Sequence, residues 1–315
     1  MTSAELQRRW QKRGGLTDPQ FALTIVIAVL LFNLIIIIIP LGYSFYLSLH
    51  DTNVILKKTE YVGFDLWAEA FAEEETQDAA IKSLIFSGIS VVLTFALSLA
   101  MALVLNLNFP GRGVLRALIL LPWAVSEVVT ATMWTMLLDA NFGVLNGILA
   151  PWAVPDGQVW LNPNWVLFWL SLAFAWHLAP LGTFFLLAAL QTIPQDLYNA
   201  ARIDRAGVFS RFWHVTLPHI RYAILIVLVV VTVEAFRQFD LVFAMTSGGP
   251  GTTSQILPLL IFRYNFQFSQ YGLASAASYV LIIVATILAM AYFVLLGRQR
   301  KQVRVAKPTA AVKAA

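Results

Sequence analysis

Four stretches of the chain contain no Asp, Glu, Lys or Arg, and they limit its possible folds more than any motif does. They cover residues 21–49, 83–111, 157–195 and 264–297. Each is longer than the roughly 20 apolar residues that a helix needs to cross the hydrocarbon core of a bilayer. Because lipid offers the backbone no hydrogen-bond partners, such runs form helices there. The sequence therefore predicts an all-α integral membrane protein.

Two further apolar segments, about 114–138 and about 222–245, bring the predicted number of transmembrane helices to six. Hydrophobic residues make up 59% of the chain and charged residues 12%, against roughly 25% charged in soluble domains. Both segments nevertheless contain charged residues, which are Glu127 in the first and Glu234, Arg237 and Asp240 in the second.

The positions of the basic residues predict the orientation of the chain. They gather before the first span, between the second and third, between the fourth and fifth, and after the sixth. With six spans all four regions lie on one side, and the positive-inside rule assigns that side to the cytoplasm. Both termini and the loop 192–221 are therefore predicted to be cytoplasmic. We expect a cytoplasmic segment 1–20, a six-helix domain 21–297 and a basic tail 298–315.

Several chemistries are excluded by composition. The chain has no cysteine, so disulfides, thiol catalysis and thiolate metal sites are ruled out. Its four histidines show no metal-ligand spacing, and no phosphate-binding Gly-x-x-x-x-Gly-Lys-Ser/Thr loop occurs. We predict no metal site, no catalytic residue and no ATP site on this chain. The pI near 9.4 does not indicate nucleic acid, because the basic residues follow the topology and are expected to meet anionic membrane lipid.

A polar segment separates the fourth and fifth spans. Gln191-Thr192-Ile193-Pro194 is expected to end the fourth span and open a new helix, since proline is tolerated in a first helical turn. Side chains three or four residues apart then share one face, and this face is small enough for another protein to approach closely. It consists of Leu197, Ala200, Ala201 and Asp204, and an aromatic segment of Phe209, Phe212 and Trp213 follows, which Leu217-Pro218 is expected to end.

This loop resembles the coupling loop of ATP-binding-cassette importer permeases. The family pattern is Glu-Ala-Ala, three residues, Gly, nine residues, Ile, any residue and Leu-Pro. Asn199 stands in place of the glutamate and Arg205 in place of the glycine, and Gly207 is expected to supply the bend instead. The resemblance implies that the ATPase-coupling residues are Asn199, Ala200, Ala201, Asp204, Arg205, Gly207, Val215, Leu217 and Pro218.

Flanking segments resemble the carbohydrate-uptake branch of that family, of the maltose and glycerol-phosphate type. They are Leu121-Pro122 leading to Trp134, residues 143–146, Phe239-Asp240 ahead of residues 246–250, and residues 271–276. The resemblance implies a type I importer permease fold in the bacterial inner membrane. It also implies a second homologous permease subunit, an ATPase dimer that holds ATP and magnesium, an external solute-binding protein and a sugar-like substrate. The solute stays open between a neutral disaccharide, a monosaccharide, an acidic sugar and a glycerol phosphate.

Ionisable groups at membrane depth are costly and by default indicate function. Glu234, Arg237 and Asp240 follow one another at single helical turns, so they form either an ion-pair cluster or part of the solute path. An arginine that faces a cavity would suit an acidic solute. A secondary transporter driven by an ion gradient is the alternative function. It would use such groups for coupling, but it would leave the 192–221 loop unexplained, and the sequence has no internal repeat that favours it.

The third span offers a second group of candidates for the solute path. Glu127 follows Pro122, and a proline can kink a helix and expose carbonyl groups to a cavity. Trp134 is expected on the same face as Glu127. A carboxylate and an aromatic ring suit a sugar. The alternatives are that Glu127 makes an interhelical hydrogen bond and that Trp134 belongs to the aromatic belt at the membrane surface. His177, in the fourth span, is expected to make a helix–helix contact rather than relay protons.

Overall fold

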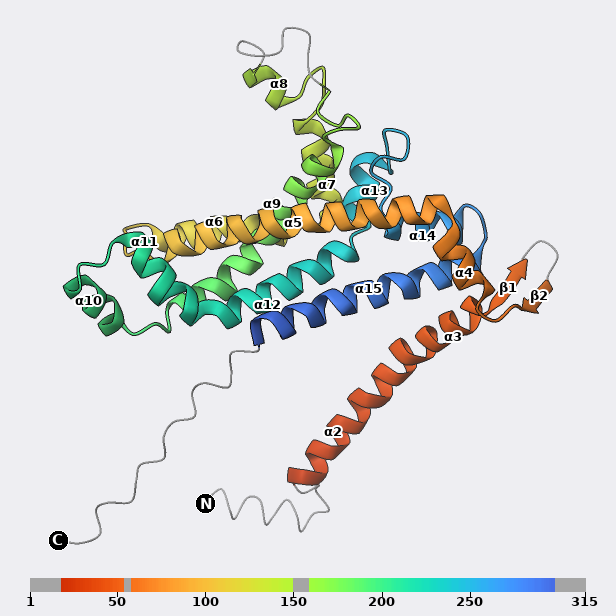
Figure 1. The fold of residues 1–315 in the computed structure, drawn as a ribbon, viewed down its shortest axis with the longest axis horizontal. Coiled ribbons are helices and arrows are strands. Elements are labelled where there is room, and N and C mark those ends of the chain that lie inside the picture. Colours follow the sequence, from red (N-terminus) through yellow and green to blue (C-terminus); the bar gives the residue numbers. More distant parts are fainter. Residues whose placement is uncertain (1–17, 54–57, 150–158, 298–315) are drawn as a thin grey trace, which may run out of the picture. The chain divides into compact units, whose positions relative to one another are not determined.

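The computed structural model describes residues 18–53, 58–149 and 159–297, and helices make up most of them (Figure 1). Most of the predicted amino-terminal segment and the whole predicted tail lie outside the described residues. The chain divides into two compact units, which are treated separately. The first runs to Ala70 and includes Ser269–Ala276, and the second consists of Phe71–Phe268 and the residues from Ala277 on.

The first unit begins with a long apolar helix. No residue in its most apolar window is buried, and the mean hydropathy of that window is 3.2. A helix that is apolar on all sides suits a lipid environment. It is made of α2 (Asp18–Asn33), the π-helical η1 (Leu34–Ile38) and α3 (Ile39–Ser48).

A small hairpin follows this helix and is the one element that departs from the all-α expectation among the described residues. Strands β1 (His50–Asn53) and β2 (Lys58–Tyr61) are antiparallel, with His50 opposite Tyr61. Helix α4 (Asp65–Ala72) comes next. The Trp67 indole N–H donates to the Ser48 hydroxyl at 3.2 Å, which joins α4 to the end of α3.

The second unit is a helical bundle in which α5, α9 and α12 pack against one another, with α6 beside α9 and α13 against α7. Figure 1 shows α10 and α11 at one end of these helices and α13 and α14 toward the other. Helix α15 starts in the first unit and continues in the second. The elements are α5 (Glu74–Asn106), α6 (Arg112–Ala124), α7 (Glu127–Leu137), α8 (Val144–Leu149), α9 (Val166–Leu190), α10 (Gln195–Ile203), α11 (Val208–Arg211), the π-helical η2 (Phe212–Thr216), α12 (Leu217–Phe236), α13 (Asp240–Thr246), α14 (Leu257–Phe266) and α15 (Tyr271–Gly297).

Helices α5 and α9 approach closely because α5 turns a stripe of small hydroxyl residues toward the core. Small residues allow membrane helices to pack backbone against backbone, and the Ser98 hydroxyl donates to the Ala179 carbonyl at 2.9 Å. Gly182 of α9 lies at the same level, in contact range of α5 and α12. The buried hydroxyl residues of α5 are Thr76, Ser83, Ser87, Ser90, Thr94 and Ser98.

We expect Gly182→Ala to destabilise the bundle by about 1 to 3 kcal/mol. A Cβ at Gly182 would overlap the Ser98 hydroxyl and lie 3.2 Å from a Val227 methyl group. Gly88→Ala in α5 is the control, because no atom lies within 4 Å of the position of its Cβ. Thermal unfolding of the purified chain in detergent should show a lower midpoint for Gly182→Ala alone. Equal midpoints for the two variants would contradict the close packing at Gly182.

The spans partly agree with the sequence prediction. Among the described residues, five helices are long and apolar enough to cross a membrane, and the pair α6 and α7 makes a sixth if it counts as one span. That pair is bent by 97°, so the predicted helix over 114–138 is two helices, and the bend is much larger than a kink at Pro122 alone. The predicted helix over 222–245 is also interrupted, because α12 ends at Phe236 and α13 starts at Asp240. The last span begins at Tyr271 rather than at 264.

Candidate functional site: the α10 loop and the break between α6 and α7

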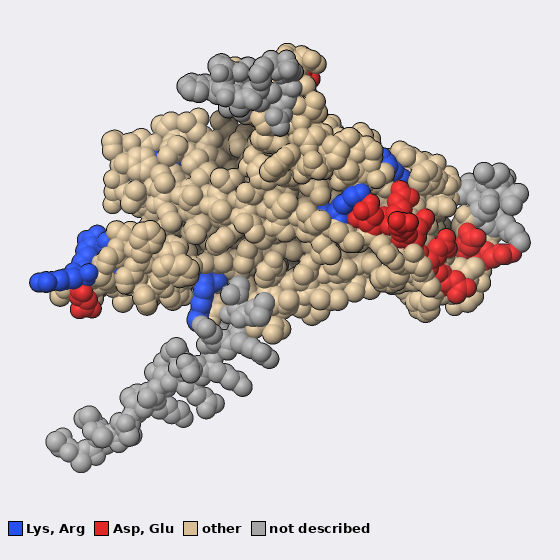
Figure 2. All heavy atoms as spheres, turned by 45° about the horizontal axis from the view of Figure 1, so that its top comes forward, with Lys and Arg blue, Asp and Glu red and all other residues tan. Residues whose placement is uncertain are grey.

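Helix α10 is a short element that protrudes from the bundle. Ile193 is buried and fixes the turn after α9, and Pro194 precedes the first residue of α10. None of the nine residues of α10 is buried. Figure 2 shows charged side chains at the left edge, where Figure 1 places α10, and an uncharged surface beside them.

The α10 helix ends in a Schellman turn whose left-handed residue is Arg205. The Ala206 N–H donates to the Ala201 carbonyl at 2.9 Å, and the Arg205 N–H donates to the Arg202 carbonyl at 3.0 Å. Arg205 has a φ of 56°, a conformation that favours glycine, which is the family residue at this position. Gly207 has φ −67° and ψ 170°, which any residue adopts. The expectation that Gly207 supplies the bend is therefore wrong.

We expect Arg205→Gly to stabilise the end of α10 by about 1 kcal/mol, because a side chain in the left-handed region costs about that much. Arg205→Ala is the control, since it removes the same charge and keeps the strain. Hydrogen exchange of the last amides of α10 should be roughly fivefold slower in the glycine variant than in the alanine variant. Equal protection in the two variants would show that the turn carries no strain.

The predicted coupling residues differ in exposure. Asn199, Ala200, Asp204, Arg205, Gly207 and Pro218 are exposed, and Ala201 is half-buried. Val215 and Leu217 instead pack against the core, so they anchor the loop rather than present a surface. The Tyr198 hydroxyl lies 2.9 Å from the Thr216 hydroxyl and joins α10 to the turn that precedes α12.

Two large side chains dominate the exposed apolar surface of this loop, and only one of them, Phe209 of the aromatic segment, was a candidate from the sequence. Ile203 is 81% exposed and Phe209 is 83% exposed. The sequence contained part of this signal, because both are large apolar residues inside the loop 192–221 that it predicts to be cytoplasmic. Large apolar side chains this exposed at one end of a bundle are typical of a surface that another protein covers.

Leu217-Pro218 does not end the aromatic segment, contrary to expectation. Helix α11, the π-helical η2 and α12 form one continuous helix over Val208–Phe236. Proline lacks an N–H and normally interrupts a helix. Here Pro218 occupies the first turn of α12 directly after the π-helical residues, where a wider turn accommodates it. The aromatic segment is therefore continuous with the fifth span.

Three predicted residues of the third and fourth spans meet at the break between α6 and α7. His177 is 7% exposed, and its Nδ1 lies 2.9 Å from the Pro122 carbonyl oxygen. Since a carbonyl only accepts, Nδ1 carries the proton and donates it. The break leaves the carbonyl groups at the end of α6 without helical partners. The His177 Nε2 lies 4.0 Å from Glu127 Oε1, so one imidazole contacts both sides of the break.

Helix α7 starts with a signal that the sequence contained. Ser126 is the N-cap residue, and its hydroxyl accepts from the Val129 N–H at 3.4 Å. Glu127 follows in the first turn, where a carboxylate is favoured by the helix dipole. Trp134 lies further along α7 and packs edge-on against Trp176, with ring centroids 6.3 Å apart.

Arg237 and Glu234 form an ion pair, whereas Asp240 belongs to another helix. Arg237 Nε donates to Glu234 Oε2 at 2.7 Å, and the arginine side chain is 68% exposed in this chain. Arg237 borders a cavity of about 380 Å³ between α12 and α15. The prediction that all three charges share one helix is wrong, because α12 ends at Phe236. Since Glu234 balances Arg237, this arginine gives no argument for an acidic solute.

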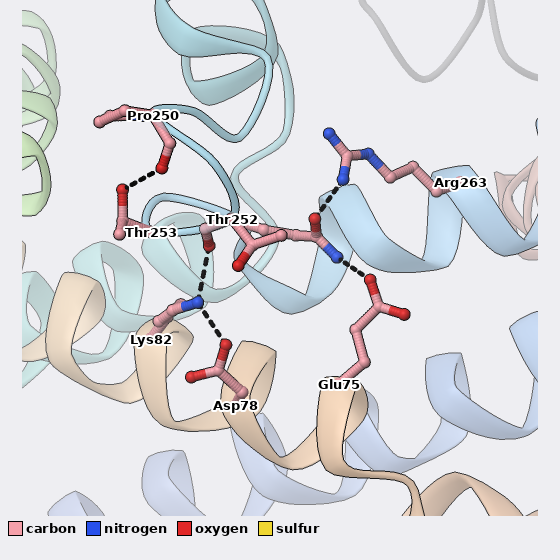
Figure 3. Close-up of polar contacts among 8 residues, drawn as sticks. Glu75, Asp78, Lys82, Pro250, Thr252, Thr253 and Arg263 are labelled. Carbon is pink, nitrogen blue, oxygen red and sulfur yellow. Dashed lines mark hydrogen bonds and ion pairs between the residues drawn. The ribbon is translucent and has the colours of Figure 1, made fainter. Parts of the chain in front are cut away.

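A polar network fastens the turn after α13 to the start of α5 (Figure 3). Arg263 donates to Gln255 and to the Ser247 carbonyl, the latter at 2.8 Å. The Gln255 amide donates to Glu75 at 2.8 Å. Lys82 pairs with Asp78 and donates to the Thr252 carbonyl at 2.6 Å. These contacts hold the loop after α13 against α5 and α14.

Tyr264 completes this network. It is 2% exposed, and its hydroxyl donates to Glu73 Oε2 at 2.6 Å. Burial, together with the hydrogen bond to Glu73, raises the pKa of Tyr264 well above 10. The phenol therefore stays a neutral donor that ties α14 to the start of α5.

Comparisons with known proteins agree with these features. The trehalose/maltose transport system permease protein MalF of Thermococcus litoralis is 34% identical over 90% of this chain and 96% of its own. The sulfoquinovosyl glycerol transport system permease protein SmoG of Agrobacterium fabrum is 29% identical over 90% and 92%. A chain of a bacterial alginate ABC transporter, solved in complex with an alginate pentasaccharide-bound periplasmic protein, has a TM-score of 0.77 at 23% identity, covering 93% of this chain and 99% of its own.

The family comparison covers most of the bundle. Residues 79–303 match the family described as the binding-protein-dependent transport system inner membrane component. The match includes the α10 loop and both helices of the bent pair. Proteins of this family are transport components of the inner membrane, and the bundle is similar in fold to a solved importer chain. This chain belongs to the family of binding-protein-dependent transport system inner membrane components.

Proposed function

We propose that this chain is one permease subunit of an ATP-driven importer and that α10 couples it to a separate ATPase, which holds ATP and magnesium. The exposure of α10 carries the proposal, because none of its nine residues is buried. Such a helix gains little stability from packing within its own chain. A partner that covers Ile203 and Phe209 would account for both the helix and its apolar surface.

The remaining partners follow from the family. A second permease subunit completes the solute path, and an external binding protein delivers the solute. The break between α6 and α7 is the part of the path that this chain contributes, with Glu127 and Trp134 on α7 and His177 on α9 beside them. Irregular backbone at membrane depth is tolerated where it is buried in protein or lines a cavity, which agrees with this role.

The solute is a carbohydrate. The relatives named for trehalose and maltose, for sulfoquinovosyl glycerol and for alginate support this class. Within it we favour a neutral sugar for two reasons. Glu127 places a carboxyl group at the break, and the charge of Arg237 is balanced by Glu234.

The test is uptake by proteoliposomes that contain the chain with its co-purifying subunits. Labelled trehalose, maltose and alginate oligosaccharides are supplied outside with the binding protein. We expect uptake of a neutral sugar. This uptake should require internal ATP and magnesium and should be absent when only an ion gradient is present. Uptake driven by the gradient without ATP would overturn the assignment as an ATP-driven importer. Uptake of the alginate oligosaccharides alone would overturn only the assignment of a neutral sugar as the solute.

A further inference from the structure

A polar pocket of about 430 Å³ lies where the ends of α5 and α9 meet the starts of α6 and α10. Three other pockets along the described helices of this unit are lined mainly by hydrocarbon side chains. Its polar lining residues include Asn106, Asn108, Arg112, Arg116, Gln191 and Tyr198.

Two guanidinium groups converge in this pocket on a single neutral acceptor. With the Gln191 amide oriented to satisfy its neighbours, its oxygen accepts from Arg112 Nη2 at 2.9 Å and from Arg116 Nη2 at 3.0 Å. Arg112 Nη1 also donates to Asn108 Oδ1 at 3.2 Å. The Nε atoms of both arginines are buried without a partner among the described residues. None of the described lining residues carries a carboxylate, so two like charges stand together unbalanced.

The start of α6 adds to the positive potential. Arg112 is its first residue, and its first turn has neither an acidic residue nor a side-chain cap. The first N–H groups of a helix have no intrahelical partner, and they attract negative charge. The pocket therefore holds two guanidinium groups with unpartnered Nε donors beside an uncapped helix start, and none of its described lining residues is acidic.

We infer that this pocket binds an anionic phosphate group. A phosphate presents several charged acceptors, and the planar fork of arginine binds it through paired hydrogen bonds. Basic pockets between membrane helices on the cytoplasmic side are suited to anionic lipid headgroups. The phosphate belongs either to such a headgroup or to a soluble phosphate, since both carry the same group.

The occupant would also touch the proposed coupling helix, a consequence that rests on the proposed function. Tyr198 of α10 lines the pocket, and its hydroxyl lies 2.9 Å from the Thr216 hydroxyl. A bound phosphate would thus restrain α10 against α6. The site itself does not depend on what α10 does, so binding and coupling are measured separately.

The experiment uses the full-length chain, with its co-purifying subunits, in nanodiscs of phosphatidylcholine. In one arm phosphatidylglycerol replaces part of the neutral lipid. In the other, inorganic phosphate is added at an ionic strength matched with chloride. We expect a rise in the apparent Tm of about 5 °C in at least one arm. A rise with phosphatidylglycerol alone identifies a lipid headgroup, and a rise with inorganic phosphate identifies a soluble phosphate.

The pocket variant is Arg112→Gln with Arg116→Gln, and it should lose the rise in the apparent Tm. Arg202→Gln removes a positive charge from an exposed position of the α10 loop and should keep that rise in the apparent Tm. Native mass spectrometry should also show one phosphatidylglycerol fewer on the pocket variant if the ligand is a lipid. If the pocket variant does not fold, Arg112→Lys with Arg116→Lys keeps the charge, lacks the fork, and should respond less than the native chain.

Three outcomes would overturn the phosphate site. The first is that the apparent Tm of the native chain does not rise in either arm. The second is equal loss of the response in the pocket variant and in the exposed control. The third is that the pocket variant binds less ATPase but shows the same rise in apparent Tm with both anions as the native chain. The two arginines would then contact a protein partner instead of a phosphate.

Discussion

Replacing Ile203 and Phe209 together by aspartate is expected to lower the amount of ATPase that co-purifies with this chain by at least about tenfold, with a parallel loss of ATP-driven uptake. These side chains are 81% and 83% exposed, so the substitutions remove no contact that the described bundle needs. Burial of a large apolar side chain contributes about 1.5 to 3 kcal/mol. A loss of 1.4 kcal/mol already corresponds to about tenfold in affinity.

Phe142→Asp is the matched control for this prediction. Phe142 is 72% exposed and lies between α7 and α8, away from the α10 loop in the sequence. This variant should retain the ATPase while the double variant loses it. Circular dichroism and gel filtration should show that both variants stay folded. Unchanged ATPase binding by a folded double variant would mean that the apolar surface of the α10 loop is not the docking surface.

The sequence predicted the helices of this chain better than their ends. Charge-free runs locate membrane helices well, because hydropathy depends on composition alone. The same runs hide breaks, since a helix that is apolar all round has no periodicity to interrupt. The break at Val125–Ser126 was marked only by Pro122 ahead of it and by the Ser126-Glu127 cap. The end of α12 at Phe236 had no such mark.

The candidate site was predicted as a set of residues but not as an arrangement. The resemblance located α10, yet the left-handed turn at Arg205 appears only in the backbone. Glu127 and His177 were both candidates. That His177 bonds the Pro122 carbonyl and lies 4.0 Å from Glu127 depends on how α9 packs beside the break. Such contacts join residues tens of positions apart. A single sequence does not contain that pairing.

His177→Leu is expected to destabilise the assembled transporter by about 2 kcal/mol and to reduce uptake by at least tenfold. The imidazole donates to the Pro122 carbonyl, which the break leaves without a helical partner. Leucine fills similar space without a donor, and a buried carbonyl that loses its hydrogen bond costs about 1 to 3 kcal/mol. Glu127 would at the same time lose its contact with the imidazole, whose Nε2 lies 4.0 Å from Glu127 Oε1. Thermal unfolding and ATP-driven uptake measure the two effects.

His177→Gln separates a hydrogen-bond role from a merely space-filling one. A glutamine amide reaches a carbonyl as a donor, so this variant should recover most of the stability and part of the uptake. Ser126→Ala is a second comparison, because the hydroxyl accepts only a long hydrogen bond of 3.4 Å and should matter less. If the leucine and glutamine variants behaved alike, the polar contact would not hold the break. The 97° bend would then be maintained by the packing of α7 against α13, and Glu127 alone would remain as the polar group of the path.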